Sequence, residues 1–536
     1  MISYRKLAMR VLGHSPVSAA KTARRRSTAK RAAALALTAA LVVGMTLPAF
    51  ADTWFIEDGN ISISAGTNGN NVTQNGTTTE NDTNTVIKGN GSSNASSNTV
   101  TIDAGEGKTV DVTLDNVNIN TSETGGAAVS VTGKGDTNIE LDGNNTLTSG
   151  YYHAGLEHNK TDDSGTLTIT DNNNDGKLTA NGGYKGAGIG GGYSSNGTVT
   201  ITGGDINANG GYKGAGIGGG YFGNGTVKIT DGDINANGGY KGAGIGGGNE
   251  KDGQVTITGG EIIANGGDGS AGIGGGYSGN GTVTISGGTV TEASGGGEGA
   301  GIGGGDSGNG TVNISGGTIT KASGGYYGAG IGGGSSGLGN VSIEGNVTIK
   351  NAQGGVGAAG IGGGARGTSD AAGNGNKISI KSTAAGSPNI TAKGGKASDD
   401  GLSGGAAIGS GSVVAGATEV KSDITIEGKV TINATGGGNV AIGDNIDGEK
   451  VFNGLAGGTN IKRTDSNGKD VTQDGDVVAE PEPEPKPEPE EPEKPAQPTV
   501  TPTEAAEAPS TGSVEVEHPV TVEGLYVTNV LGKQIT

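Results

Sequence analysis

Apolar and polar residues alternate over short stretches of this chain, and glycines end each stretch. In "GTVTIT" (197–202), Val199 and Ile201 fall on one face and the threonines on the other, which is the periodicity of a β-strand. Two glycines follow, "DINAN" (205–209) then places Ile206 and Ala208 on one face, and "AGIG" contributes a third apolar position. The pattern predicts three short strands separated by glycine corners.

This unit recurs along most of the chain. The isoleucines of successive "AGIG" segments are 28, 28, 28, 29, 29 and 30 residues apart. They are Ile189, Ile217, Ile245, Ile273, Ile302, Ile331 and Ile361. Weaker copies are centred on Val129, Leu156, Ile408 and Ile442, so that the array covers most of residues 55–450. A period of about 20 to 50 residues indicates a solenoid.

Stacking these units predicts an all-β fold, a right-handed parallel β-helix with coils of about 28 residues. Coils about 4.8 Å apart place each inward residue over its counterpart in the next coil. Crossovers between parallel strands are right-handed in nearly all proteins. The expected core is a set of columns, among them Val199, Val227, Val255 and Val283, and Ile206, Ile234, Ile262 and Val290.

The corners also explain a motif that would otherwise suggest a cofactor. Gly186, Gly188 and Gly191 have the G-x-G-x-x-G spacing of dinucleotide-binding loops, but that motif is meaningful only where it opens a helix. Here the glycines repeat instead. Corners need positive φ angles and close approach of backbones, and glycine supplies both.

Composition and charge limit how the fold can be stabilised and which partners it can bind. The 536 residues include 115 glycines, 4 phenylalanines, 1 tryptophan and no cysteine, so backbone ladders and a repeated small core must supply the stability. The net charge is −19, and residues 1–51 contain nine Lys or Arg and no acid, which leaves −19 − 9 = −28 for the rest. This acidity argues against a nucleic-acid partner.

The two ends of the chain differ from the repeats. Residues 1–51 combine basic residues, an alanine-rich apolar run and "AFA" (49–51), which predicts a secretory signal peptide cleaved near Ala51 and no membrane span in the mature chain. Residues 52–478 are the predicted β-helix. Residues 479–513 are rich in proline and glutamate and predict an extended, disordered linker suited to association with a cell wall. Residues 514–536 are a short segment that could begin a further domain.

One segment resembles a known family. Residues 110–150 contain the strand "VTLDNVNI", the return "GGAAVSV" and the coil "NIELDGNNTLTSG", and "GAGIGGG" coils follow after residue 180. This pattern is similar to the bacterial secreted carbohydrate-binding domain-containing proteins. The resemblance implies a parallel β-helix that binds polysaccharide, in some members with calcium. It covers residues 100–450 and assigns no ligand residues.

Tyrosines recur at fixed positions of the repeat and are candidate carbohydrate-binding residues. Adjacent members should lie about one coil apart on the surface, where they would form either a platform for sugar rings or a stabilising aromatic ladder. Five residues before the column isoleucine stand Tyr184, Tyr212, Tyr240 and Tyr326, and four residues after it stand Tyr193, Tyr221 and Tyr277.

A lysine column runs beside the tyrosines. Lys185, Lys213 and Lys241 would repel one another unless something anionic lies near. The column Asp205, Asp233 and Glu261 could neutralise them if the corners bring it close. Otherwise the lysines form a solvated charged face or bind an acidic polysaccharide, whose carboxylates also recur along an extended chain.

The segment "DNNNDG" is a candidate calcium site. Asp171, Asn173 and Asp175 alternate oxygen-bearing side chains before Gly176, as calcium loops do. The position where such loops carry a bidentate acid is Gly182, so Asp162 and Asp163 would have to supply oxygens. The same residues also suit a plain turn.

These features predict an exported surface or secreted bacterial protein that binds polysaccharide without catalysis. A structural adhesin or stalk with a protein partner is the alternative. A polysaccharide lyase is a further possibility, because His153, Glu157 and His158 occur together in one unusual coil and could act as acid and base. An ice-binding threonine array is disfavoured because Lys228 and Asn313 interrupt it.

Overall fold

The computed structural model describes residues 53–161, 164–367, 375–399, 401–413, 420–444 and 446–480, and two short strands beyond them. The predicted signal peptide, the predicted linker from residue 481 onward and the proposed oxygen donors Asp162 and Asp163 lie outside the described residues. Residues 482–536 form a separate unit, of which the antiparallel strands β41 (Val527–Thr528) and β42 (Gln534–Ile535) are described.

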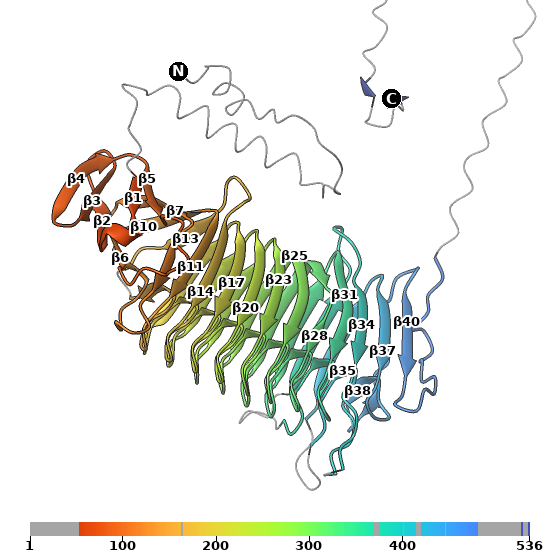
Figure 1. Ribbon diagram of the computed structural model, residues 1–536. Coiled ribbons are helices and arrows are strands. Elements are labelled where there is room, and N and C mark those ends of the chain that lie inside the picture. The colour runs from red at the N-terminus through yellow and green to blue at the C-terminus, as the bar shows by residue number, and fades with distance from the viewer. Residues whose placement is uncertain are drawn as a thin grey trace, which may run out of the picture. The chain divides into compact units, whose positions relative to one another are not determined.

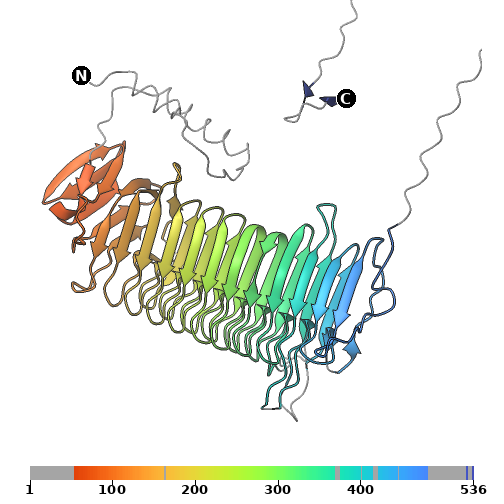
Figure 2. The same ribbon diagram turned by 45° about the vertical axis from the view of Figure 1, so that its right-hand side comes forward.

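The described chain up to Glu480 is a parallel β-solenoid of about 14 turns (Figure 1). The parallel β-helix predicted from the repeats is therefore confirmed. Figure 2 shows the strands of successive coils side by side, joined by corner loops. The described residues contain no helix of the length and hydrophobicity needed to cross a bilayer.

The strands form three parallel ladders, each running the length of the solenoid. The first contains β1 (Thr53–Phe55), β5 (Thr85–Lys88), β7 (Thr109–Asp115), β10 (Asp136–Asp142), β13 (Leu167–Thr170), β16 (Asn196–Ile201), β19 (Gly225–Ile229), β22 (Gly253–Ile257), β25 (Gly281–Ser294), β27 (Gly310–Ile319), β30 (Gly339–Glu344), β33 (Asn376–Lys381) and β36 (Ser422–Glu427).

The second ladder shares β25 and β27, which continue around the corner. Its other members are β8 (Asn118–Asn120), β11 (Asn144–Thr148), β14 (Lys177–Asn181), β17 (Asp205–Asn209), β20 (Asp233–Asn237), β23 (Glu261–Asn265), β28 (Ala322–Ser323), β31 (Val347–Gln353), β34 (Asn389–Lys393), β37 (Thr431–Thr435) and β40 (Asn460–Thr464).

The third ladder carries the isoleucine column. It contains β2 (Ile61–Ala65), β6 (Val100–Ala104), β9 (Val129–Gly133), β12 (Leu156–Lys160), β15 (Ile189–Gly190), β18 (Ile217–Gly218), β21 (Ile245–Gly246), β24 (Ile273–Gly274), β26 (Ile302–Gly303), β29 (Ile331–Gly332), β32 (Ile361–Gly362), β35 (Ile408–Gly409) and β38 (Ile442–Asp444).

The predicted columns form the core. Ile217 pairs with Ile245, Val199 with Val227 and Ile206 with Ile234, and each is almost fully buried. The isoleucine column also extends to Val100 and Ile61, beyond the repeats that the sequence made visible. Glycine is required at its corner: Gly218 has φ +134°, and a Cβ there would overlap the carbonyl oxygen of Gly246 in the next coil.

Both ends of the stack are covered. At the N-terminal end, the 3-10 turn η2 (Ile56–Asp58) and the antiparallel strands β3 (Asn70–Gln74) and β4 (Thr77–Asp82) cap the first coils. At the C-terminal end, β39 (Gly448–Glu449) pairs antiparallel with β38. There the fully buried Arg463 contacts Glu449 at 2.9 Å and Asp476 at 2.7 Å. Such caps stop the open ladders from pairing with another molecule.

Candidate functional site

One surface of the solenoid gathers most of the aromatic residues that the structure describes. They project from the corners on either side of the short third-ladder strands β15, β18 and β21, because the "NGGYKG" and "GGGY" segments turn the chain there. We call this surface the tyrosine–lysine strip. Its members are Tyr151, Tyr152, Tyr184, Lys185, Tyr193, Tyr212, Lys213, Tyr221, Tyr240, Lys241 and Tyr277.

The first tyrosine column is a stacked ladder. The ring centroids of Tyr184 and Tyr212 lie 4.9 Å apart with their planes 7° from parallel, and those of Tyr212 and Tyr240 lie 5.1 Å apart. Tyr151 extends the ladder at 4.8 Å. The sequence signal that could have found Tyr151 was its position five residues before Leu156, the same offset as in the other members of the column. The rings face one another along the solenoid axis, so they offer their edges and hydroxyl groups to solvent.

The lysines lie over the second tyrosine column. The Lys185 ammonium is 4.4 Å from the ring centroid of Tyr193, that of Lys213 is 4.5 Å from Tyr221, and that of Lys241 is 3.5 Å from Tyr277. Cation–π contacts of this kind are attractive. They hold three positive charges in a row, each about one coil from the next.

The acidic column expected as a possible counter-charge lies elsewhere. Asp205 pairs with Lys177 at 2.9 Å, and Asp205 and Asp233 line a groove at the corner between the first two ladders. That corner is separated from the strip by the whole second-ladder strand. Of the three explanations left open for the lysines, neutralisation by this column therefore does not apply; a solvated charged face and an acidic ligand remain.

Tyr326 is separated from the strip. Asp268 and Gly297 occupy its column in the two intervening coils, and Tyr326 contacts Tyr327 instead, edge to face at 4.5 Å. The Arg366 guanidinium lies 4.0 Å from the Tyr327 ring centroid and donates a hydrogen bond of 2.8 Å to the Tyr327 hydroxyl. These three residues form a second, smaller aromatic group.

The strip ends at a pair of carboxyl groups. Glu298 stands four residues before Ile302, where earlier coils have lysine, and Asp306 stands four residues after it, where they have tyrosine. Burial and the mutual repulsion of the two carboxyls raise the pKa of Glu298, and burial raises the pKa of Asp306. Asp268 in the coil between accepts a hydrogen bond from the Tyr240 hydroxyl, which raises the pKa of that phenol.

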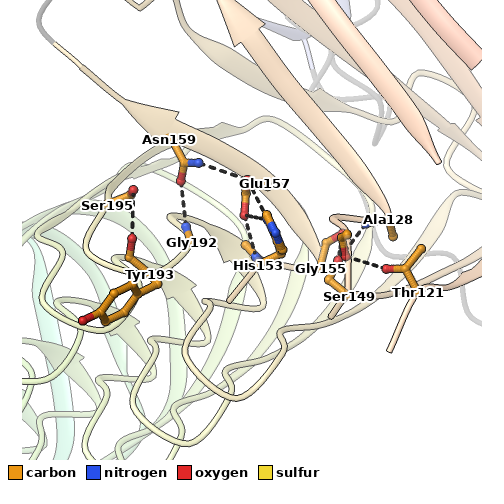
Figure 3. A network of polar contacts seen from close by, with 12 residues as sticks. Thr121, Ala128, Ser149, His153, Gly155, Glu157, Asn159, Gly192, Tyr193 and Ser195 are labelled. Atoms are coloured by element: carbon orange, nitrogen blue, oxygen red, sulfur yellow. Dashed lines mark hydrogen bonds and ion pairs between the residues drawn. The ribbon is translucent and has the colours of Figure 1, made fainter. Parts of the chain in front are cut away.

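The candidate acid–base cluster divides into two parts. His153 Nδ1 contacts the buried Glu157 carboxylate at 3.0 Å, which also accepts hydrogen bonds from the Ala154 amide and from Asn159 (Figure 3). The Glu157 hydrogen bond raises the pKa of His153. His158 is buried, contacts the Thr198 carbonyl oxygen at 2.9 Å, and its pKa is lowered by burial. The structure thus brings His153 and Glu157 together and directs His158 to a different neighbour.

The candidate calcium residues lie around a third carboxylate that sequence analysis missed. The side chains of Asn173 and Asp175 hydrogen-bond the carboxyl of Asp142, and burial together with the nearby Asp115 and Asp175 raises the pKa of Asp142. Asp171 accepts a hydrogen bond from the Asn174 amide at 2.8 Å, as in an Asx turn. Within the described ranges, no three His, Asp or Glu side chains converge as a preformed metal site.

Comparison with known proteins bears on the repeats alone. The sequence profile of the Beta helix repeat family matches six segments, residues 173–193, 199–221, 227–249, 255–277, 283–306 and 312–335. In the structure, the matched segments are coils of the parallel β-helix. No curated protein and no solved structure shows significant similarity to it. The six matched repeats of the β-helix protein include most of the strip and the Glu298–Asp306 pair.

Proposed function

We propose that this β-helix protein is exported and binds polysaccharide without catalysis, with the tyrosine–lysine strip as its binding face. One observation carries the proposal: the strip collects eight of the chain's twelve tyrosines on one surface. Tyr184, Tyr212 and Tyr240 keep 43%, 41% and 46% of their surface exposed. Contiguous exposed aromatic surface of this kind is typical of binding sites.

The geometry supports contact with ring edges rather than stacking on ring faces. Neighbouring tyrosines of the first column cover each other's faces, so a glycan running along the solenoid axis would meet phenol hydroxyls, ring edges and ammonium groups. Tyrosine presents both an apolar body and a hydrogen-bonding tip, which suits the mixed character of a sugar. The coil spacing repeats these groups in step with a polymer.

Export and calcium belong to the same proposal. The basic and apolar composition of residues 1–51 supports export, and the proline- and glutamate-rich residues 479–513 support a wall-crossing spacer. Asp142, Asn173 and Asp175 would hold calcium, with Asp171 nearby, because two carboxyls drawn together gain from a shared cation. The ion would brace the corner between the first and second ladders, near the start of the repeats.

A glycan array with the full chain tests the proposal. We expect binding to extended polysaccharides, weakened when Tyr184, Tyr212 and Tyr240 are replaced together by alanine. Tyr326→Ala is the matched control, since that tyrosine is exposed but lies outside the strip. Melting temperatures should be measured for both variants. Loss of stability with unchanged affinity per folded molecule would show that the ladder only stabilises, and binding to proteins with no glycan bound would favour the adhesin alternative.

A further inference from the structure

Apart from the exposed Glu250, the charged residues of the strip are separated along the solenoid into a lysine part and a carboxyl part. Three ammonium groups occupy consecutive coils, at Lys185, Lys213 and Lys241. The next two coils carry carboxyl groups instead: Asp268 stands at a first-column tyrosine position, Glu298 at the lysine position and the adjoining Asp306 at a second-column position. This order of charges has little effect on a neutral ligand, whereas a polyanion would be attracted to the lysines and repelled by the carboxyl groups.

The register makes the replacement direct. The third-ladder strands β21, β24 and β26 pair in register, with Ile245 beside Ile273 and Ile273 beside Ile302. Glu298 therefore lies in the same column as Lys241, two coils further on, which is about 10 Å at the coil spacing. Charges this close along a surface act on the same ligand before salt screens them.

The coil between them keeps the two parts in one continuous surface. Gly269 occupies the lysine position there, and a Cβ on Gly269 would overlap the ring of Tyr277. The absence of a side chain at this position lets the Tyr277 ring lie over it, and the Asp306 amide donates a hydrogen bond of 2.7 Å to the Gly269 carbonyl. Tyr277 thus bridges the last lysine and the first carboxyls.

We propose that the strip binds an acidic polysaccharide with about one carboxylate per coil, and that Glu298 and Asp306 are specificity-determining residues that end the binding site on its C-terminal side. This inference rests on the function proposed above. From the coil of Tyr151 to that of Tyr277 the strip spans four coil spacings, about 19 Å, which would seat about four sugars of an extended chain.

The boundary should depend on pH. The groups that face Glu298 and Asp306 are each other, Asp268, Lys241 and Arg366. Both carboxyls have pKa values above the ordinary range, because burial disfavours their charged forms. As the pH falls, they gain protons at a higher pH than exposed uronate carboxylates with ordinary pKa values do. The repulsion between these two carboxyls and a bound uronate should therefore disappear before the uronate itself loses its charge.

The decisive experiment measures affinity against ligand length. Full-length chain is titrated with oligogalacturonates of increasing length and with neutral cello-oligosaccharides, by calorimetry at pH 7.5. For the unaltered chain, affinity for the acidic series should rise up to about four sugars and then level off. In the double variant Glu298→Gln, Asp306→Asn it should continue to rise. The control Glu344→Gln, Asp423→Asn removes two charges from exposed positions outside the strip and should behave like the unaltered chain.

Two further measurements test the role of the lysines and the effect of pH. Replacing Lys185, Lys213 and Lys241 by glutamine should lower affinity for oligogalacturonate about tenfold, from three exposed pairs of modest strength, and leave cello-oligosaccharide binding unchanged. As the pH is lowered from 7.5, the unaltered chain should approach the length dependence of the double variant before the oligogalacturonates lose their own charge. Circular dichroism and melting temperatures establish that each variant is folded.

Each outcome decides a different claim. If the unaltered chain binds no glycan of either series, the proposed function fails. If it binds both series equally and the lysine variant is unaffected, the acidic class is wrong while polysaccharide binding stands. If acidic glycans bind but the double variant levels off at the same length as the unaltered chain, Glu298 and Asp306 do not set the boundary.

Discussion

At the scale of single residues, one repeated backbone conformation explains how the strip is presented. The residue after each second-column position adopts a left-handed conformation with φ between 57° and 63°, although none is glycine. Several of these amides donate to the next coil, for example Ser194 to the Tyr221 carbonyl at 2.7 Å. This hydrogen bond offsets the cost of the conformation. The positions are Ser194, Phe222, Glu250, Ser278, Ser307, Ser336 and Arg366.

A single charged residue in a core column should lower the stability of the fold. Ile245 is fully buried between Ile217 and Ile273. Ile245→Asp would bury an unpaired carboxylate, and we expect it to cost several kcal/mol and to open the stack. Thermal unfolding followed by circular dichroism, with limited proteolysis, measures this. Gln254→Asp, on the outward face of the same coil, is the control and should change the melting temperature little. Equal effects of the two substitutions would contradict the assigned register.

His153 should make stability depend on pH. Its pKa in the folded protein is raised by Glu157, so its stabilising contribution is fully present below the unfolded pKa of about 6.5 and is lost as the pH rises through the folded value. We therefore expect the unaltered chain to lose stability relative to Glu157→Gln as the pH rises above the ordinary histidine pKa of about 6.5. Denaturant unfolding at several pH values measures the difference.

A direct titration separates this histidine from its neighbour. NMR should give His153 a pKa above the ordinary value that falls in Glu157→Gln, whereas the pKa of His158 stays low because its burial is unchanged. His158 destabilises the fold as the pH falls, but it does so in both proteins and cancels from the comparison. Identical His153 titrations in the two proteins would remove the proposed role of Glu157.

At the scale of elements, side-chain ladders join successive coils. Asn209 donates to Asn181, Asn237 to Asn209 and Asn265 to Asn237, at 2.9 to 3.0 Å. Each amide both donates and accepts along the column, so that few polar groups remain unpaired at this corner. In another side-chain column, each side-chain oxygen accepts a hydrogen bond from the backbone amide of the equivalent residue in the next coil. Asn196 accepts from Asn224, Asn224 from Asp252, and Asp252 from Asn280. Asparagine recurs in the repeat for this structural reason.

The corner segment 171–176 should respond to calcium. Binding to the folded form alone stabilises by about 2.7 kcal/mol at one hundred times the dissociation constant, and so the melting temperature should rise with millimolar calcium and return with a chelator. Asp142→Asn with Asp175→Asn should abolish the response. Asp423→Asn, at an exposed position of the later strand β36, is the control and should retain it. A response that survives the double substitution would place the ion elsewhere.

At the scale of the whole molecule, the solenoid behaves as a stack in which each coil contacts its neighbours. In such proteins the stability is close to a sum of coil and interface contributions. The strip follows the same rule, since its length is the number of coils that carry tyrosine and lysine. Adding or removing coils should therefore change binding and stability in steps.

A coil deletion tests this modularity. Removing residues 214–241 joins Lys213 to Gly242 and keeps every inward residue in phase, because the two positions are equivalent in the repeat. We expect a folded protein with a slightly lower melting temperature and weaker glycan binding. Removing only residues 214–227 puts the following strands out of phase and should prevent cooperative folding. Circular dichroism and protease resistance distinguish the two, and similar behaviour of both deletions would contradict a columnar core.

The fold could be predicted from the sequence because its signals are local and repeated. Alternation assigns Val199 and Ile206 to the inside, glycines mark the corners, and a constant period sets the register, so the columns follow without knowledge of any distant contact. The tyrosine and lysine columns were predictable for the same reason. Their spacing along the axis is the coil spacing.

Only the tertiary structure decided what the side chains at the corners contact. Asp142 meets Asp175 across two coils, His153 meets Glu157 while His158 turns to Thr198, and the tyrosine rings stack on one another. The repeat specifies where each residue lies along the solenoid axis and on which face of its strand. The direction of a side chain at a corner, however, depends on the backbone angles there and on the neighbouring coil. The acidic end of the strip depends on both, because Glu298 and Asp306 are eight residues apart and adjoin only when the coil closes.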